Sequence, residues 1–147
     1  MIRPHLVPLA MILASFGCGS KAPPPGTLPS DPTTALVRFL AAVKANDIQA
    51  MGDLWGSDKG PANAWMAHAD RERRLTVIRA TLAFESYAID RAGPLPGPSD
   101  RERVVRVQLV RNNCRPTVPF TMLQYRDGWL INRIDLDAAG NPRRPCP

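Results

Sequence analysis

The amino-acid sequence predicts an α+β fold in which N-terminal helices pack on a curved antiparallel sheet of about four strands. Apolar residues recur at helical spacing in the first half of the domain and alternate with polar residues in the second half. The first 32 residues follow neither pattern. We therefore divide the chain into residues 1–17, residues 18–32 and one domain of residues 33–147. Hydrophobic residues make up 44% of the chain, which is enough to bury a core.

Residues 1–17 have the organisation of an export signal. One basic residue, Arg3, precedes an apolar run from Leu6 to Gly17, and small residues lie just before Cys18. A charged start, a short apolar core and a small-residue cleavage site are typical of a secretory signal peptide. The run is too short for a membrane-spanning helix, which needs roughly 20 apolar residues. We expect cleavage before Cys18 and export of the rest of the chain.

The stretch Leu13-Ala14-Ser15-Phe16-Gly17-Cys18 resembles the signal of bacterial lipoproteins, with Gly17 directly before the cysteine. The resemblance implies that Cys18 carries acyl chains such as palmitate, which makes a membrane the partner of the protein. It also implies a place in the bacterial cell envelope, on the outer membrane facing the periplasm or on the cell surface. Ser15 stands where lipoproteins most often have an aliphatic residue. The alternative is ordinary cleavage at the same position, which would give a soluble secreted protein.

The segment 18–32 is predicted to be a tether. It holds five prolines between Pro23 and Pro32, and its other residues are mostly small or polar. Pro-rich polar segments form semi-extended spacers rather than packed structure. We expect this spacer to hold the domain away from the bilayer.

The three cysteines have two expected roles. An odd number in an exported protein needs an explanation, and lipidation of Cys18 leaves Cys114 and Cys146 as a pair. Exported proteins meet an oxidising environment, so we predict a disulfide that pins the C-terminal tail to the sheet edge. The chain-entropy model gives roughly 3–4 kcal/mol for a loop of about 30 residues. The alternatives are two free thiols or a metal site, for which two cysteines without a nearby histidine are too few ligands.

Two helices are predicted at the start of the domain. Asp31 and Pro32 suit a helix cap and first turn, Asn46 suits a left-handed helix end, and Asp47 suits the cap of the next helix. The apolar residues of these helices are Leu36, Phe39, Leu40 and Val43, followed by Ile48, Met51, Leu54 and Trp55.

A third helix is predicted over residues 64–83, after a loop over residues 56–63. Its apolar side would hold Trp65, His68, Leu75, Ile78 and Leu82. The tryptophans at positions 55, 65 and 129 all fall on predicted apolar faces. We expect them in the core, with the lining of a pocket as the alternative.

Four strands are predicted in the second half of the domain. Residues 84–91 place Tyr87 and Ile89 on one face, and the Pro-rich residues 92–100 are predicted to be a loop. Two alternating runs follow: Val105, Val107 and Leu109 with Arg106 and Gln108, then Phe120 and Met122 with Thr121 and Leu123. Asp127-Gly128 predicts a tight turn, after which residues 129–136 form the last strand.

This order of elements resembles the nuclear transport factor 2-like family, which shares a cone-shaped fold with polyketide-cyclase-like and ketosteroid-isomerase-like proteins. The resemblance rests on Phe39 to Asp47 followed by Ile48 to Trp55, and on the closing hairpin from Tyr125 to Ile131. It covers most of residues 33–137. It implies a concave pocket between the sheet and the helices.

Enzymes of this fold class often pair an Asp or His base with a hydrogen-bond donor in the cone. His68 or Asp53 as base, with Tyr87 or Tyr125 as donor, are the candidates that the resemblance implies here. The structural alternative, which we favour, makes His68 part of a helix face, Asp53 a solvated or capping group, and both tyrosines residues at the core edge. We therefore assign no catalytic residue.

The sequence lacks the motifs of hydrolases and of nucleotide-binding proteins. Ser57 and Ser86 have no hydrolase motif around them, and the sequence holds no Gly-rich phosphate loop or dinucleotide fingerprint. We expect no cofactor and no metal. The formal net charge of +6 comes from basic residues interleaved with acidic ones, as on a solvated face. Export also argues against nucleic acid as a partner.

The sequence therefore favours a membrane-tethered, non-enzymatic binding or interaction domain, whose partner is a small apolar ligand or another envelope protein. One alternative is a small isomerase- or cyclase-like enzyme that uses the candidates above. Another is a structural partner in envelope assembly, which could pair with itself as a homodimer.

Overall fold

Helices α1 (Pro32–Ala45) and α2 (Ile48–Leu54) begin where the sequence predicts. The computed structural model describes residues 26–144. The carboxylates of Asp31 and Asp47 each accept a hydrogen bond from the backbone amide three residues on, at 2.7 and 2.9 Å. Asn46 ends α1 in the left-handed region, with φ 57° and ψ 29°. All three capping predictions are confirmed.

The loop predicted over residues 56–63 is instead a small hairpin that leads into a helix. Strand β1 (Gly56–Ser57) pairs antiparallel with β2 (Gly60–Pro61), and α3 (Ala62–Trp65) follows directly. Gly60 has a φ of 101°, which L side chains rarely adopt, so the tight turn favours glycine there.

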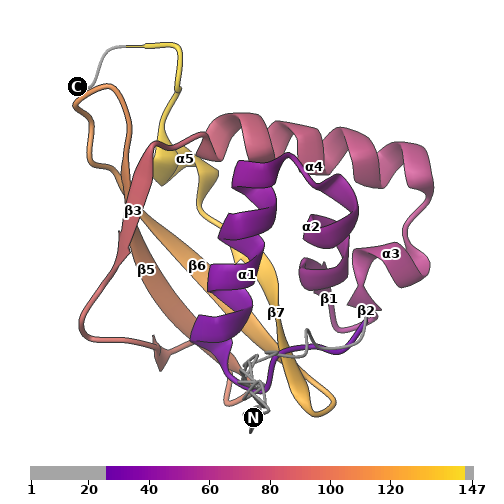
Figure 1. Cartoon of the computed structure of the whole chain (residues 1–147). Helices are drawn as coiled ribbons and strands as arrows, with labels where there is room; N and C mark the ends of the chain where they lie inside the picture. The colour runs from indigo at the N-terminus through magenta and orange to yellow at the C-terminus, as the bar shows by residue number, and fades with distance from the viewer. Residues whose placement is uncertain (1–25, 145–147) are drawn as a thin grey trace, which may run out of the picture.

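The helix predicted over residues 64–83 is broken in two. Helix α3 ends at Trp65, and α4 (His68–Leu82) starts after Met66 and Ala67, which both have the extended ψ of 137°. The Trp65 indole Nε1 donates a hydrogen bond of 3.0 Å to the Gly60 carbonyl oxygen, which holds α3 against the hairpin. Figure 1 shows that α3 lies at an angle to α4. The spacing of apolar residues does not predict this break, because the Trp65 hydrogen bond is made to Gly60 in strand β2 and not within the helix.

In the described part of the chain, the main sheet has five strands, one more than predicted. They are β3 (Ser86–Ile89), β4 (Leu95–Pro96), β5 (Glu102–Val110), β6 (Thr117–Tyr125) and β7 (Gly128–Ile134). The order is β3-β5-β6-β7 with antiparallel neighbours, and β4 pairs antiparallel with β5. The additional strand, β4, lies in the Pro-rich stretch that was predicted to be a loop. A two-residue edge strand tolerates proline because one side of it needs no partner.

The predicted tight turn joins β6 to β7. Tyr125 pairs with Gly128, so the two turn residues are Arg126 and Asp127, one position earlier than the Asp-Gly pair suggests. Arg126 takes the positive φ of 52° that this turn requires. Gly128 is the first residue of β7, and its lack of a side chain makes room for Leu28 of the N-terminal segment.

The last strand is shorter than predicted because a helix begins within its range. Strand β7 ends at Ile134, and helix α5 (Leu136–Ala139) starts two residues later. Asp135 caps α5 by accepting a hydrogen bond of 2.9 Å from the Ala138 amide. The capping interaction stops the strand before Leu136.

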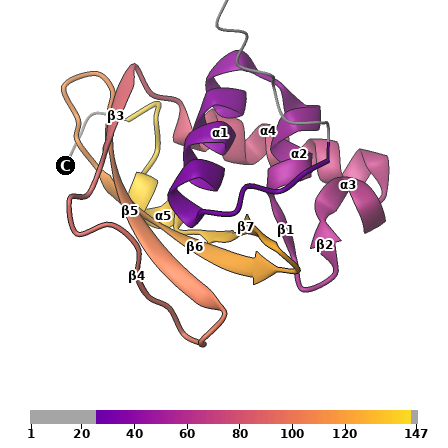
Figure 2. The same cartoon turned by 60° about the horizontal axis from the view of Figure 1, so that its bottom comes forward.

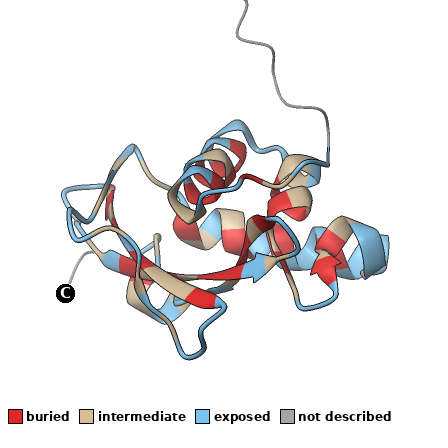
Figure 3. Cartoon of the chain, turned by 90° about the horizontal axis from the view of Figure 1, so that it is seen from below, coloured by how far each residue is buried: buried red, intermediate tan, exposed pale blue. Residues whose placement is uncertain are grey.

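The core lies between the helices and one face of the sheet (Figures 2 and 3). The inward-facing residues that the alternation predicts in β5 and β6 are fully buried: Val105, Val107, Leu109, Phe120 and Met122. The predicted helix stripes meet them and are buried as well: Leu36, Phe39, Leu40, Val43, Met51, Leu75, Ile78 and Leu82. The fold is therefore α+β, with helices on one face of an antiparallel sheet. The buried members of this core all lie between Ala35 and Ala139.

Part of the predicted tether packs on the domain. Pro29 is buried, and its carbonyl oxygen accepts a hydrogen bond of 2.8 Å from the Trp129 amide at the edge of β7. A Cβ added at Gly128 would lie 2.4 Å from the Cβ of Leu28, so a glycine permits this close approach. The ordered domain thus includes residues before position 33.

No helix within residues 26–144 has both the length and the apolar character needed to cross a bilayer.

Candidate functional site

The candidate base His68 lies on the surface. His68 starts α4 with its side chain 77% exposed, and its Nδ1 lies 3.6 Å from the Glu72 carboxylate one turn later. The prediction that His68 lies on the buried side of the helix is wrong. The first buried residue of α4 is Arg71, one turn further along, and the apolar part of the buried stripe begins at Leu75.

Asp53 has a structural partner. Its carboxylate accepts a hydrogen bond of 2.5 Å from the Asn63 side-chain nitrogen, which also donates to the Gln49 carbonyl oxygen at 2.8 Å. Asp53 is half-buried on α2 and Asn63 lies on α3. The contact therefore ties the two helices together.

The two candidate tyrosines lie in different places. Tyr87 on β3 packs edge-to-face with Phe84, with ring centroids 5.5 Å apart and planes at 85°. Tyr125 ends β6, and the Arg126 guanidinium lies 5.2 Å from its ring centroid. Among the described residues, no hydrogen bond joins any two of His68, Asp53 and these tyrosines. The structure does not bring the base and donor candidates together.

The expected concave pocket between sheet and helices is filled by side chains. The largest fully buried ones include Phe39, Phe120, Met51 and Met122, which meet between α1, α2 and the sheet. The cavities described below lie instead at the edges of the fold, because these bulky residues occupy the interior.

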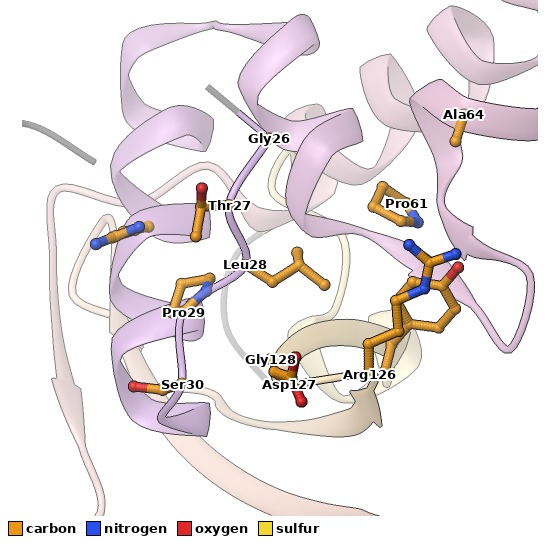
Figure 4. A pocket seen from close by; sticks show the side chains of 12 residues that line it. Gly26, Thr27, Leu28, Pro29, Ser30, Pro61, Ala64, Arg126, Asp127 and Gly128 are labelled. Atoms are coloured by element: carbon orange, nitrogen blue, oxygen red, sulfur yellow. The ribbon is translucent and has the colours of Figure 1, made fainter. Parts of the chain in front are cut away.

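A groove of about 680 Å³ opens beside the β6–β7 turn (Figure 4). We call it the hairpin groove. Its lining comes from four parts of the fold: residues 26–30, Arg38 on α1, Pro61 and Ala64 near the small hairpin, and residues 125–128. In Figure 4 the Leu28 side chain points from the N-terminal segment toward the turn.

Among residues 26–144, three charged residues line the hairpin groove, Arg38, Arg126 and Asp127. Arg38 is half-buried, yet within residues 26–144 its guanidinium has no hydrogen bond or ion pair. Arg126 is exposed in the turn and contacts the Tyr125 ring. A guanidinium without a partner in the described part of the chain can donate two parallel hydrogen bonds to an anionic group.

An exposed tryptophan follows Ala64, one of the residues that line this groove. Trp65 is 41% exposed, so its prediction as a core residue is wrong. Lys59 lies 5.3 Å from its ring centroid. A Cβ added at Gly60 would meet the Tyr125 ring at 2.9 Å, so the small hairpin lies directly against this tyrosine. Trp55 and Trp129 are half-buried and pack against the core, as predicted.

A second cavity of about 640 Å³ lies at the other end of the sheet and is lined partly by Arg111, Cys114 and Arg144. Arg111 is buried, and its guanidinium donates to the carbonyl oxygens of Thr81 at 2.5 Å and of Ala139. Burial lowers the pKa of Arg111 by removing water from the charged form. Arg111 thus joins the C-terminal ends of α4 and α5, where a cation is favourable.

The predicted cysteine roles fall largely outside the described residues. Cys114 is disulfide-bonded, whereas Cys146 and Cys18 lie outside residues 26–144, so the pairing and the lipidation stay predictions. Among the described residues, no group of three or more His, Cys, Asp or Glu side chains could hold a metal ion.

Comparison with protein-family models, with curated proteins and with solved structures found no match. Function must therefore be argued from the geometry of this chain.

The sequence did not reveal the groove residues Arg38, Arg126 and Leu28. Arg38 is one of sixteen arginines, and Leu28 lay inside the predicted tether. The one available signal was the tight turn, since turn residues at the end of a hairpin are often exposed.

Proposed function

We propose that this protein is a lipid-anchored domain of the bacterial cell envelope, of the nuclear transport factor 2-like type. Its activity is non-enzymatic binding, and the hairpin groove holds the ligand. The anchor is the acylated Cys18 on the outer membrane, and soluble secretion is the alternative that the sequence leaves open. Self-association as a homodimer stays a prediction from the family resemblance.

One observation carries the binding role. The hairpin groove combines apolar and aromatic lining, from Leu28, Pro61 and Tyr125, with the guanidinium of Arg38, which has no hydrogen bond or ion pair within residues 26–144. Ligand sites are mostly apolar concave surfaces with a few polar groups that orient the ligand. The groove fits a ligand that has an apolar part and an anionic group.

The enzymatic alternative has less support. A base and a donor must lie within hydrogen-bond reach of one reacting group. His68 contacts Glu72 at the surface and Asp53 contacts Asn63 between helices. Neither residue lines the hairpin groove.

Labelling with radioactive palmitate tests the anchor. The wild-type protein produced in a bacterial host should incorporate label and sediment with membranes, and Cys18→Ala should do neither. Equal labelling of both proteins, or no labelling of the wild type, would reject the lipid anchor.

Equilibrium dialysis with anilinonaphthalene sulfonate, an apolar anion, tests the groove. Ala64→Trp places an indole on the groove lining and should weaken binding at least about fivefold by filling space. Ala41→Trp is the matched control, since Ala41 is exposed on α1 and does not line the groove. If both variants bind the probe as the wild type does, the groove is not the site.

A further inference from the structure

Few residues separate the predicted anchor, Cys18, from the first described residue, Gly26. Eight residue steps separate Cys18 from Gly26, because residues 27–31 already pack on or cap the domain. At about 3.3–3.6 Å for each extended residue, these steps span at most about 29 Å. A domain of this size is roughly 35 Å across. The connection is therefore shorter than the domain itself.

This length restricts how an anchored domain can face the bilayer. Gly26 lines the hairpin groove, so the connection enters the domain at that groove. If the groove faced away from the membrane, residues 18–26 would have to pass around the domain to reach the bilayer. That path is longer than the roughly 35 Å width of the domain, whereas the connection spans at most about 29 Å. The groove must then face the bilayer or lie beside its surface.

We propose that the hairpin groove faces the anchoring membrane and binds the phosphate headgroup of an anionic phospholipid. The proposal rests on the lipid anchor and the binding groove of the proposed function and names the ligand. Arg38 and Arg126 contact the phosphate oxygens, since a guanidinium donates two parallel hydrogen bonds to such groups. Leu28 and Pro61 provide apolar contacts for the glycerol and the first methylenes.

Two aromatic residues suit this position at the membrane surface: Tyr125, which lines the groove, and Trp65, which follows the lining residue Ala64. Trp65 is 41% exposed while its Nε1 keeps a hydrogen bond, and Tyr125 lines the groove. Tryptophan and tyrosine are favoured at the level of lipid headgroups, where an apolar ring and a polar atom both find partners. Lys59, over the Trp65 ring, adds a third cation.

Two acidic residues limit the purely electrostatic attraction. Asp127 lines the groove beside Arg126, and Asp58 neighbours Lys59 in the small hairpin. The net charge of this surface is therefore small. Affinity must therefore come from direct arginine–phosphate contacts rather than from a general positive field. Selectivity for an anionic headgroup then comes from the choline cation of a zwitterionic lipid, which the neighbouring guanidinium groups repel.

The test uses a chain that starts at Gly19, which keeps every buried core residue and carries no acyl group. Circular dichroism verifies folding of each variant. The probe is dihexanoyl-phosphatidylglycerol below its micelle concentration, and dihexanoyl-phosphatidylcholine, which is zwitterionic with no net charge, is the comparison. Calorimetric titration should show phosphatidylglycerol binding at least about fivefold more tightly, and weaker binding when NaCl rises from about 50 to about 300 mM.

Matched substitutions locate the site. Arg38→Gln and Arg126→Gln should each weaken phosphatidylglycerol binding at least about fivefold. Arg106→Gln should leave binding unchanged, because Arg106 is exposed on β5 between residues that face the core. Equal effects of all three substitutions would overturn the proposal, since they would indicate only a loss of general charge.

Hydrogen exchange on the acylated full-length protein tests the orientation. Residues 57–61 and 125–128 should exchange more slowly on vesicles that contain phosphatidylglycerol than on phosphatidylcholine vesicles. Slower exchange of β5 alone would place the opposite face on the membrane and overturn the proposal.

The outcomes separate this inference from the proposed function. If both short-chain lipids bind equally well, or neither binds while anilinonaphthalene sulfonate still occupies the groove, the anionic-lipid assignment fails and the binding groove stands. If palmitate labelling fails, the anchor fails, and with it the argument for orientation.

Discussion

The carbonyl oxygen of Pro29 accepts a hydrogen bond of 2.8 Å from the amide of Trp129. This contact joins a segment with the composition of a linker to the edge strand β7. A second contact protects the same strand, a parallel bridge between Trp55 and Ile131. Covered edges resist pairing with other chains, so the N-terminal segment is part of the fold as well as a connection.

Gly128→Ala should destabilise the protein. Its Cβ would lie 2.4 Å from the Cβ of Leu28, so residues 26–30 or β7 must shift. We expect a loss of roughly 1–3 kcal/mol in unfolding free energy, measured by urea denaturation. Leu28→Gly removes the opposing Cβ and should restore part of the loss in the double variant, whereas Leu28→Ala keeps that atom and should not. Strictly additive effects of Leu28→Gly and Gly128→Ala would contradict the contact.

Arg111→Met should also destabilise the folded protein, because carbonyl groups at the ends of α4 and α5 lose their hydrogen-bond donor. The Thr81 and Ala139 oxygens both accept from this guanidinium. The expected loss is about 2–4 kcal/mol in urea denaturation. Arg106→Met is the control and should change stability by less than about 0.5 kcal/mol, since Arg106 is exposed. A loss of the same size in both variants would count against the proposed role.

The lowered pKa of Arg111 predicts how the unfolding free energy depends on pH. Burial lowers the pKa of Arg111, so near that pKa the unfolded chain binds more protons than the folded one. The contribution of Arg111 to the unfolding free energy therefore increases as the pH rises, and this change is confined to strongly alkaline solution. From roughly pH 5 to 9 the stability difference between wild type and Arg111→Met should stay constant. A steep pH dependence in that range would mean that another titrating group is coupled to this site.

Cys146→Ser should lower the unfolding free energy by roughly 3–4 kcal/mol if Cys146 is the disulfide partner of Cys114. Reductant should produce the same loss in the wild type and none in the variant. Mass spectrometry of non-reduced peptides identifies the partner directly. Alkylation of both thiols without reductant would exclude the bond.

Substitution of His68 and Asp53 separates a surface residue from a structural one. His68→Ala should change stability by less than about 0.5 kcal/mol, because its side chain is 77% exposed. Asp53→Ala should cost about 1 kcal/mol, since the partly buried Asn63 amide loses an acceptor. Thermal denaturation measures both. An Asp53→Ala protein as stable as His68→Ala would show that the link between α2 and α3 contributes little.

The two tyrosines should differ in ligand binding. Tyr125→Ala removes an aromatic wall of the hairpin groove and should weaken binding of anilinonaphthalene sulfonate at least about threefold. Tyr87→Ala, on β3 beside Phe84, should leave it unchanged. Equilibrium dialysis of both variants provides the comparison, and a larger effect of Tyr87→Ala would place the site elsewhere.

Local interactions made much of the fold predictable. The caps at Asp31 and Asp47 depend on amides three residues away, and the buried alternation of Val105, Val107 and Leu109 depends only on strand period. Such features need no knowledge of distant segments. The candidate site was not predictable in this way, because Arg38 and Tyr125 come from an early helix and a late strand.

The sequence by itself determined the starts of α1 and α2, the alternating strands β5 and β6, the closing hairpin and the α+β order, because each depends on neighbours within a few residues. Only the tertiary structure decided that α3 separates from α4, that β4 joins the sheet and that Leu28 lies against Gly128. It also decided that bulky side chains fill the interior and leave a groove at the edge. The physical reason is that these features arise where segments far apart in the sequence compete for the same space and the same hydrogen-bond partners.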